Sequence, residues 1–277
     1  MNPKGVAVVT GASRGIGKAT ALGLAKAGWD IVVAAKTEKP HPRLAGTIHE
    51  TAREIEALGR RALAVKTDVR EEDDLRALAE KAAGFGVIDV VVHNAGAIWL
   101  YPVAETPLKR YDLVMEVNAR AAFALAALFT PAMAERGAGH FVVVSPPVDL
   151  QALPGRVAYC VSKFGMTMLA LGLAAELKAR GVSVNALWPA TAIRSAATET
   201  FGMGTPEQWR RPEVFADAVV ELANTRPGEV SGRAMTDEEW LRERGVTDFA
   251  KYRCVASSEP PPMAVRDYPS HGRLRPR

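Results

Sequence analysis

The chain has 277 residues, of which 48% are hydrophobic and 24% charged, the proportions of an ordinary soluble globular protein able to bury one large core. Its net charge of +4 is modest, and the basic residues are scattered apart from a tail with Arg273, Arg275 and Arg277, so no nucleic-acid partner is expected. Apolar stretches are broken by Gly, Pro or charge before the roughly 20 residues that span a bilayer, so no membrane partner is expected.

Short β-branched runs alternate along the chain with longer runs rich in Ala and Leu. The short runs predict strands at 5–10, 30–35, 61–66, 87–92, 139–145 and 182–188, and a further strand near 232–235. The longer runs predict helices at 15–28, 47–58, 71–84, 107–130, 156–180 and 212–225. Continuously apolar strands are typical of a parallel sheet that helices cover on both faces. The sequence therefore predicts an α/β fold, a doubly wound parallel sheet of the Rossmann type in a single domain.

We expect the folded domain to cover residues 1–252. From residue 253 the sequence lacks periodicity and contains the run Pro260-Pro261-Pro262, so 253–277 is expected to be an extended or disordered tail. The two cysteines, Cys160 and Cys254, argue against a disulfide framework and fit a reducing, cytoplasmic location. The first apolar run follows Met1 within a few residues, so no leader is expected.

A glycine-rich turn, Thr10-Gly11-Ala12-Ser13-Arg14-Gly15-Ile16-Gly17, joins the first predicted strand to the first helix. Glycines let the backbone approach a ligand closely, and the free amides at the start of a helix attract a pyrophosphate. Between a first strand and a first helix, the turn predicts a dinucleotide site. A turn without a ligand is the alternative interpretation.

The second predicted strand ends Ala34-Ala35-Lys36-Thr37, and the first acid, Glu38, comes two residues after Lys36. Sites for NAD usually place an acid at the strand end to bind the ribose hydroxyls, whereas sites for NADP place a cation to meet the 2′-phosphate. Lys36, with Arg14 from the glycine turn, therefore favours NADP(H) as the cofactor. The alternative is a lysine that is merely solvated.

Tyr159 and Lys163 lie four residues apart at the start of a predicted helix, so their side chains share one face. A neighbouring ammonium favours the phenolate and lowers the pKa of a tyrosine, which makes the pair a possible acid and base for an alcohol oxygen near neutral pH. The alternative is a surface tyrosine and lysine on an amphipathic helix.

Residues 4–235 resemble the short-chain dehydrogenases/reductases in the order and approximate spacing of their motifs. The matching residues are Thr10-Gly11-x-x-x-Gly15-x-Gly17, Asp68-Val69, Asn94-Ala95-Gly96, Asn118, Ser145 and Tyr159-x-x-x-Lys163. Within the family the chain looks most like the hydroxysteroid dehydrogenase-like proteins of the second type. That likeness rests on Ala34-Ala35-Lys36-Thr37, His41-Pro42, Leu44-Ala45-Gly46-Thr47-Ile48, Val144-Ser145-Pro146-Pro147 and Asn185-Ala186-Leu187-Trp188-Pro189. Such relatives can carry a sterol-carrier domain, which we do not expect in a chain of this length.

The resemblance implies four catalytic residues. Tyr159 would transfer the proton, Ser145 would polarise the substrate oxygen, and Lys163 would lower the pKa of Tyr159 and bind the nicotinamide ribose. Asn118 would hold a water that replenishes the proton, which would explain an asparagine inside an apolar helix. A serine at the end of a strand is otherwise common in turns.

The resemblance also implies the contacts of the cofactor, and no metal is expected. They are Gly11, Ser13, Arg14, Gly15, Ile16, Gly17, Lys36, Asp68, Val69, Asn94, Ala95, Gly96, Tyr159, Lys163, Pro189, Thr191 and Ile193. Asp68 would accept from the adenine, with a turn or capping aspartate as the alternative. The sequence departs from the family at His93, which replaces an asparagine, and at Ala190, which replaces a glycine. We expect His93 to be a packing substitution.

Taken together, these features predict an NADP(H)-dependent oxidoreductase that moves a hydride between the nicotinamide and a carbonyl or secondary alcohol. The substrate is expected to be a small apolar molecule, because the candidates to face it are largely apolar: Ile98, Trp99, Pro146, Pro147, Val148, Leu153, Trp188 and residues 194–211. A reductase of fatty-chain or acyl-thioester intermediates and an NADPH-binding regulatory protein without turnover are the alternatives. By analogy with the family we expect a homodimer or homotetramer built on helices 107–130 and 156–180.

Overall fold

A seven-stranded sheet forms the centre of the computed structural model, which describes residues 4–40 and 45–267. All of its pairings are parallel, and the strand order is β3-β2-β1-β4-β5-β6-β9. The strands are β1 (Val6–Thr10), β2 (Asp30–Ala35), β3 (Ala62–Lys66), β4 (Ile88–His93), β5 (Gly139–Val144), β6 (Val182–Trp188) and β9 (Arg233–Thr236). All seven predicted strands and the predicted fold class are confirmed. His41, Pro42 and Leu44, used for the resemblance, and the arginines of the basic tail lie outside the described residues.

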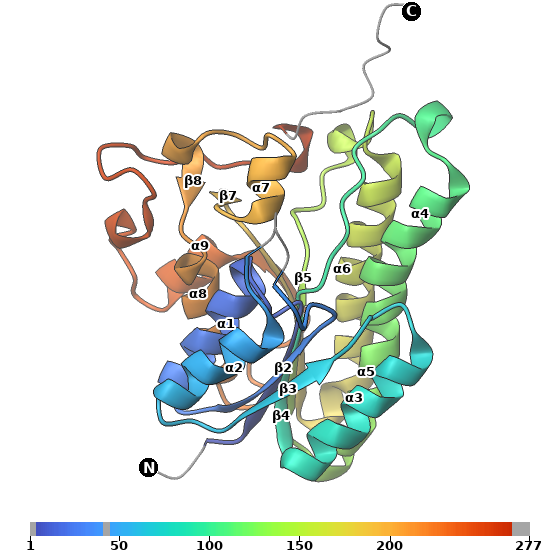
Figure 1. Cartoon of the computed structure of the whole chain (residues 1–277), viewed down its shortest axis with the longest axis vertical. Coiled ribbons are helices and arrows are strands. Elements are labelled where there is room, and N and C mark those ends of the chain that lie inside the picture. The colour runs from blue at the N-terminus through green and yellow to red at the C-terminus, as the bar shows by residue number, and fades with distance from the viewer. Residues whose placement is uncertain (1–3, 41–44, 268–277) are drawn as a thin grey trace, which may run out of the picture.

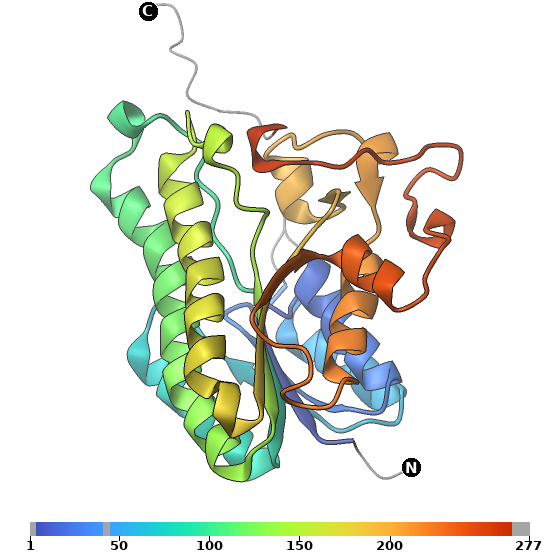
Figure 2. The ribbon, with the colours of Figure 1, turned by 180° about the vertical axis from the view of Figure 1, so that it is seen from behind.

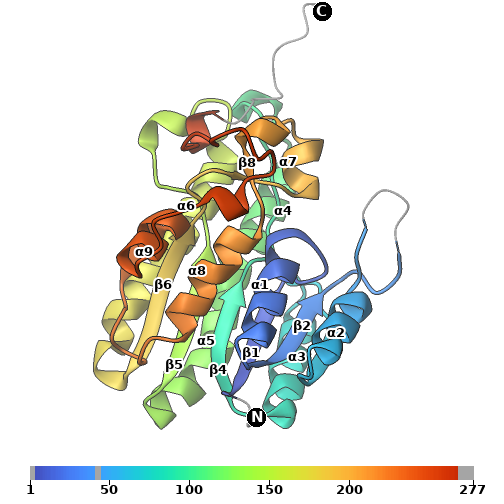
Figure 3. The same cartoon turned by 90° about the vertical axis from the view of Figure 1, so that its left-hand side faces the viewer.

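Helices cover both faces of the sheet (Figures 1 and 2). The face that Figure 3 turns toward the viewer carries α1 (Gly15–Lys26), α2 (Ile48–Ala57), α8 (Glu213–Ala223) and α9 (Asp237–Glu243). The opposite face carries α3 (Glu72–Phe85), α5 (Ala121–Arg136) and α6 (Val157–Leu177), and α4 (Leu108–Val114) precedes α5. Strand residues alternate between the two layers, since Val9 and Val33 pack with α1 and α8 residues whereas Val8 and Val32 pack with α3 and α5 residues. This alternation explains why the strands are mostly apolar on both faces.

The order of the strands reverses between β1 and β4, which are neighbours in the sheet although β2 and β3 lie between them in the chain. In doubly wound sheets such a point leaves a crevice at the carboxyl ends of the strands, where ligands bind. The glycine turn after β1 and the segment Asn94-Ala95-Gly96 after β4 both lie at this point.

The predicted helix 107–130 is wrong in two respects. It is interrupted by a π-helical segment, η2 (Met115–Arg120), between α4 and α5, and it continues through Pro131 to Arg136. A proline lacks the N–H for the helical bond and usually stops a helix, but α5 retains the turn that contains it, where the Thr130 hydroxyl donates to the Ala126 carbonyl at 2.8 Å. A π-helical segment is not visible in apolar periodicity.

Four short elements were not predicted: β7 (Ala192–Ile193), β8 (Trp209–Arg210), α7 (Ala196–Thr200) and α9. β7 and β8 form a separate parallel pair, and two-residue strands are too short to show alternation. The start of α9 did have a signal in the sequence. Thr236 and Glu239 form a reciprocal capping box, with the side chain of each residue accepting from the main-chain N–H of the other.

The described part of the C-terminal segment, residues 253–267, runs back over the carboxyl ends of the strands (Figure 1). Glu259 accepts from Arg210 at 2.6 Å, and the Met263 N–H donates to the Ala190 carbonyl at 2.9 Å. Arg266 pairs with Asp149 at 3.1 Å. These contacts fasten the segment to the region around β7, β8 and the loop after β5, while the predicted division of the chain at residue 253 stays a prediction.

Two helical stretches, Leu108–Arg136 and Val157–Arg180, are long and apolar enough to cross a membrane by length and composition. The apolar runs in both are interrupted by charge, Gly or Pro, as expected from the sequence, but such interruptions do not by themselves exclude a membrane-spanning length. In the structure α5 and α6 contribute Leu125, Phe129, Met166 and Ala170 to the core beside the sheet, as core helices do.

Candidate active site

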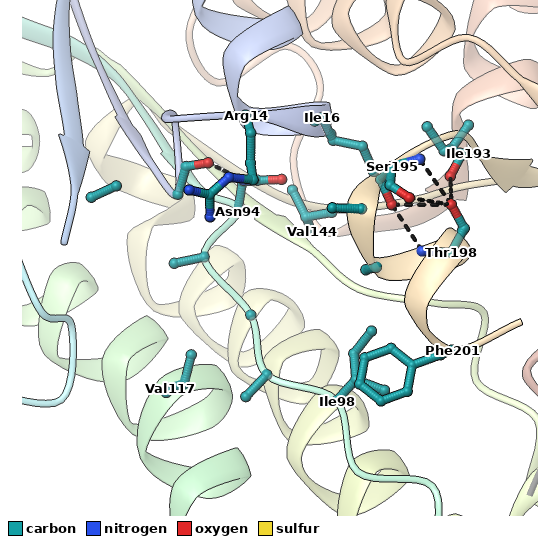
Figure 4. A pocket seen from close by; sticks show the side chains of 18 of the residues that line it. Arg14, Ile16, Asn94, Ile98, Val117, Val144, Ile193, Ser195, Thr198 and Phe201 are labelled. Carbon is teal, nitrogen blue, oxygen red and sulfur yellow. Dashed lines mark hydrogen bonds between the residues drawn. The ribbon is translucent and has the colours of Figure 1, made fainter. Parts of the chain in front are cut away.

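A cavity of about 620 Å³ opens at the carboxyl ends of the strands, around the point where the strand order reverses. Figure 4 shows Arg14 and Asn94 at one end of it and Ile98 and Phe201 at the other. Of the expected cofactor contacts, Gly17 alone does not line the cavity, and it packs directly behind the glycine turn. The size falls within the range of small-molecule and cofactor sites.

The glycine turn is packed tightly against the loop after β4. A Cβ atom on Gly17 would lie 2.4 Å from both Asn94 Nδ2 and the Gly11 carbonyl oxygen, so no other residue fits without displacing backbone. The Thr10 hydroxyl accepts from the main-chain N–H groups of Asn94 and Ala95, each at 3.1 Å. This packing holds the start of α1, with its free amides, against the cavity, and the arrangement fits a pyrophosphate.

Two cations line the end of the cavity next to β2. Lys36 follows the last residue of the strand and is exposed. Arg14 donates through Nε to the Ala45 carbonyl at 3.0 Å, and through Nη2 to Gly46 and to the Thr37 hydroxyl at 3.1 and 3.3 Å. These bonds leave the two Nη1 hydrogens uncommitted among the described residues. Arg14 therefore holds the loop after β2 and can still donate to an anion.

Asp68 lines the cavity beyond the end of β3, as Val69 does, but its carboxylate already has a partner. Arg70 forms a bidentate ion pair with this carboxylate, donating through Nε at 2.9 Å and through Nη2 at 2.6 Å. Hydrogen bonds from Arg70 lower the pKa of Asp68, so the carboxylate is charged at neutral pH. These bonds within the turn fit the alternative interpretation of Asp68 as a turn aspartate. The carboxylate oxygens of Asp68 still have lone pairs that can accept from a further donor, such as the adenine.

Tyr159 and Lys163 lie in the first two turns of α6, and both are buried beside the cavity. Lys163 Nζ donates to the Val144 carbonyl at 2.8 Å, so the lysine reaches across to the end of β5. A Cβ on Gly96 would lie 3.3 Å from this Nζ, which shows how closely the loop after β4 approaches the ammonium. Burial lowers the pKa of Lys163 to about 8, so the ammonium form still predominates at pH 7.

Ser145 follows β5, is buried and lines the cavity, and its hydroxyl bonds to residues of α6. It donates to the Lys163 carbonyl at 2.8 Å and accepts from the Thr167 hydroxyl at 3.2 Å. Donation to a substrate oxygen, as the sequence predicted, would need the first of these bonds to break, because a serine hydroxyl has one proton.

Asn118 lies inside the π-helical segment η2 and is fully buried. Its Oδ1 accepts from the Ala97 N–H at 2.8 Å, and its Nδ2 donates to the Ala97 carbonyl at 3.0 Å and to the Ser162 hydroxyl at 2.9 Å. Both amide hydrogens are thus used within the protein, so the side chain could bind a water only as an acceptor. Its observed role is to fix the loop after β4 to α6.

His93 is completely buried and is more than a packing substitution. Its Nε2 lies 3.2 Å from the Asn118 carbonyl and its Nδ1 lies 3.0 Å from the Thr10 hydroxyl. A carbonyl can only accept, so the proton is on Nε2 and the Thr10 hydroxyl donates to Nδ1. Burial, and then the nearby Lys163 charge, lower the pKa of His93 to about 3. A neutral imidazole therefore connects the glycine turn to the π-helical segment.

The loop after β6 supplies Pro189, Thr191 and Ile193 to the cavity wall. The Ala190 N–H donates to Asp237 Oδ1 at 2.9 Å, which ties this loop to the start of α9. Burial raises the pKa of Asp237 to about 7. The Ile193 carbonyl accepts from the Thr198 hydroxyl at 2.9 Å, which fastens the end of β7 to α7. Thr198 and Ser195 line the same wall of the cavity.

The other end of the cavity is apolar. Ile98, Leu113, Pro146, Phe201 and Met203 line it. Behind them an apolar cluster includes Leu100, Ala152, Leu153, Tyr159, Cys160, Phe164 and Met263. Of the residues expected to face the substrate, Trp99, Pro147, Val148, Leu153 and Trp188 are not part of the cavity wall in the described structure.

Two of these five residues have evident structural roles. Trp99 stacks on Tyr101 with centroids 4.2 Å apart, and Trp188 donates to Thr167 at 3.3 Å. The sequence reasoning also missed Thr167 and Met263. Thr167 stands four residues after Lys163 and so shares its helix face, a signal that was available. Met263 comes from the aperiodic C-terminal segment, which gave none.

The described residues contain no group of three or more His, Cys, Asp or Glu side chains able to hold a metal ion. Residues 5–202 match the family model of the short chain dehydrogenases. The chain is 42% identical over 267 residues to hydroxysteroid dehydrogenase-like protein 2 of Homo sapiens, covering 94% of this chain and 63% of that protein. It thus spans less than two thirds of that relative's length.

Two solved structures are also similar. A short chain dehydrogenase from Mycobacterium thermoresistibile is 37% identical, with a TM-score of 0.87 over 98% of this chain and 97% of the other. A metagenomic short-chain oxidoreductase in complex with NADP is 29% identical, with a TM-score of 0.71 over 83% of this chain and 95% of the other. Since the family model covers most of the chain and the fold and the tyrosine–lysine pair agree with it, this chain belongs to the short chain dehydrogenases, and it resembles the hydroxysteroid dehydrogenase-like proteins of the second type.

Proposed function

We propose that the chain is an NADP(H)-dependent oxidoreductase that interconverts a carbonyl and a secondary alcohol on an apolar substrate. The observation that carries the proposal is the position of Tyr159 and Lys163. They are buried side chains on one face of α6, and they line a cavity that runs from two cations beside β2 to an apolar wall at Phe201 and Met203.

The nicotinamide cofactor, when bound, supplies or accepts the hydride. Tyr159 gives a proton to the substrate oxygen during reduction and takes it back during oxidation. Lys163 stabilises the phenolate form of Tyr159 through its charge, and its position next to Gly96 puts the ammonium at the floor of the cavity, where it would also bind the nicotinamide ribose. Asn118 and His93 hold the loop after β4 in place around both residues.

The preference for NADP(H) rests on Lys36 and Arg14. Lys36 is at the end of β2, and Arg14 has two Nη1 hydrogens directed to no described residue. A 2′-phosphate between them would be neutralised by both cations. The NADP complex of the metagenomic relative supports the same choice.

The class of substrate is proposed from the apolar end of the cavity. Its wall offers few polar groups to orient a charged or sugar-like substrate, whereas a hydrocarbon ring or chain would bury its surface there. The test is a panel of carbonyl compounds graded in chain length and ring size, including acyl thioesters, incubated with NADPH while its oxidation is followed. Oxidation with ring ketones but not thioesters supports this function. Tight NADPH binding without oxidation across the panel would show a binding protein instead.

We also propose that the chain forms a homodimer or homotetramer through α5 and α6. Apolar side chains are exposed on both helices, with Phe123 exposed at 66% and Met168 at 71%. Val161 and Leu171 on α6 are exposed as well. Met168→Glu would place a charge in such an interface and should yield a monomer by light scattering, whereas Leu58→Glu at the end of α2 should not. A wild-type chain that is monomeric at micromolar concentration contradicts this part.

A further inference from the structure

The hydroxyl of Ser145 is directed by its neighbours, and the direction can be derived. An indole N–H can only donate, and Trp188 Nε1 lies 3.3 Å from Thr167 Oγ1. Thr167 therefore accepts from Trp188 and uses its own proton on Ser145 Oγ, 3.2 Å away. A serine hydroxyl has one proton, and the only partner left for it in this chain of bonds is the Lys163 carbonyl at 2.8 Å.

The place of this hydroxyl along α6 separates it from Tyr159. Its partners are at residues 163 and 167, and residue 163 already lies about 6 Å along the axis from residue 159 at 1.5 Å per residue. Helical side chains lean toward the N-terminus, which moves the phenol of Tyr159 further from Ser145. A substrate oxygen must lie about 2.5–3.0 Å from each hydroxyl that donates to it. One oxygen is poorly placed to meet both of these.

Ser145 instead forms half of a reciprocal clamp with Lys163. The lysine ammonium donates to the carbonyl of Val144, and the hydroxyl of the next residue, Ser145, donates to the carbonyl of Lys163, each at 2.8 Å. The two bonds join the end of β5 to α6, one through the ammonium and the other through the main-chain carbonyl of the same lysine. Loss of the serine hydroxyl would release one of them and let the lysine shift relative to Tyr159.

Ser145 itself lines the cavity, and so does the residue that follows it. Pro146 is buried and lines the cavity wall. A proline has no N–H and no polar side-chain atom, so it cannot donate to a substrate oxygen. Position 146 therefore presents a hydrocarbon surface to the cavity, whereas a serine at the same position would present a hydroxyl.

We propose that Ser145 is a positioning residue for Lys163 and does not polarise the substrate oxygen, and that Pro146 occupies the place from which a side-chain donor could reach that oxygen. The inference assigns Ser145 a different role from the one that the resemblance implied, and it rests on the proposed oxidoreductase function. Its consequence is that Tyr159 both binds the substrate oxygen and protonates it, without a hydroxyl from Ser145.

The first test is the titration of Tyr159, because it needs no substrate. Tyrosinate absorbance is measured against pH in the NADP⁺-bound protein, and the curve of the same protein carrying Tyr159→Phe is subtracted. Ser145→Ala should raise the pKa of Tyr159 by about one unit, since a less well-placed ammonium stabilises the phenolate less. Ser145→Thr keeps a hydroxyl and should restore the wild-type curve.

Turnover of the best carbonyl from the panel gives the second readout. Ser145→Ala should lower kcat less than about tenfold, whereas loss of a donor to the reacting oxygen typically costs about 100- to 1,000-fold. A loss of 100-fold or more with an unchanged Tyr159 titration would overturn the proposal, because Ser145 would then act on the substrate. An unchanged titration with unchanged turnover would overturn it too, because no positioning role would remain.

Pro146→Ser tests the second half of the proposal, with Pro146→Ala as its matched control for loss of the ring. A serine there should raise kcat about tenfold above the alanine variant. Equal rates of the two variants would show that position 146 does not reach the oxygen. If the wild type reduces no carbonyl yet Tyr159 titrates as expected in the Ser145 variants, the oxidoreductase function fails while the role of Ser145 stands.

Discussion

The imidazole of His93 donates through Nε2 to the main-chain carbonyl of Asn118, 3.2 Å away. The acceptor lies in a π-helical segment, where the backbone departs from the α-helical pattern. The same ring accepts from Thr10 at 3.0 Å, and Thr10 in turn accepts from the amides of Asn94 and Ala95. One neutral side chain thus links the cofactor turn, the loop after β4 and the π-helical segment η2.

The first prediction concerns stability at acid pH. Burial lowers the pKa of His93 to about 3 from a usual 6.5. Between pH 6.5 and 3, His93 is therefore protonated in the unfolded chain and neutral in the folded chain. Stability should therefore fall as pH decreases from 6.5 toward 3, with a contribution from this group of at most about 1.4 kcal/mol per pH unit.

His93→Asn removes this titration. Urea unfolding of the wild type and the variant at a series of pH values measures the contribution of His93 alone. His140, whose pKa is also lowered by burial, is present in both proteins, so its contribution cancels in the difference. The difference in unfolding free energy between the two proteins should shrink as pH falls from 6.5 to 4. A difference that is constant with pH would mean that His93 titrates normally.

Lys163 gives the corresponding prediction at alkaline pH. Burial lowers its pKa to about 8 from 10.5, so between these values the unfolded state binds the proton and the folded state does not. The wild type should gain stability over this range relative to Lys163→Met, by at most about 1.4 kcal/mol per pH unit. Parallel unfolding curves of the two proteins from pH 8 to 10 would refute the lowered pKa.

The third prediction concerns the choice of cofactor. Lys36 is exposed, so the attraction between it and a 2′-phosphate is screened, and we expect about 1–3 kcal/mol, or roughly 10- to 100-fold tighter binding of NADPH than of NADH. Ala35→Asp with Lys36→Ala should invert the ratio, because a carboxylate repels the phosphate and accepts from the free ribose hydroxyls.

The measurement is the ratio of the two dissociation constants at low and high salt. Lys66→Ala serves as the control, since Lys66 is an exposed lysine at the end of the neighbouring β3. Equal wild-type affinities, or a ratio that salt does not change, would identify Lys36 as a solvated lysine and favour NAD(H).

The fourth prediction concerns the anchor of the C-terminal segment. Arg210 on β8 is 2% exposed and pairs with Glu238 at 2.5 Å and with Glu259 at 2.6 Å. Arg210→Met would leave the partly buried Glu238 with only Arg242, 3.3 Å away, and should cost about 1–3 kcal/mol. Glu259 is largely exposed, so Glu259→Gln should cost only about 0.2–1 kcal/mol. Urea unfolding that gives both variants the same stability would contradict this assignment of the buried pair.

Much of the fold could be predicted because burial requires apolar residues at positions that recur with the period of a strand or a helix. The strands from Val6 to Thr10 and from Phe141 to Val144 are buried at every position and almost entirely apolar since both faces are covered, and the helices between them carry the longer period. What failed depends on specific contacts. The predicted helix ended at residue 130, but α5 continues through Pro131 to Arg136, and the π-helical segment that contains the buried Asn118 leaves no mark in the apolar periodicity.

The same distinction holds within the site. The glycine turn and the spacing of Tyr159 and Lys163 follow from local sequence, and the structure brings them to one cavity. The direction of the Ser145 hydroxyl depends on Thr167 and Trp188, which come from later parts of the chain. Spacing places a residue on an element, but the partners that orient its side chain are known only once the elements have packed.

The most direct test of the proposed function is Tyr159→Phe, assayed with NADPH and the best carbonyl substrate of the panel. The change removes a single hydroxyl from a buried ring that packs with Phe164 and Leu100, so the fold and the cofactor site should persist. We expect turnover to fall by about 100- to 10,000-fold while the dissociation constant of NADPH stays within a few-fold of the wild type. Turnover near that of the wild type, with NADPH bound normally, would contradict the assignment of Tyr159 as the proton donor.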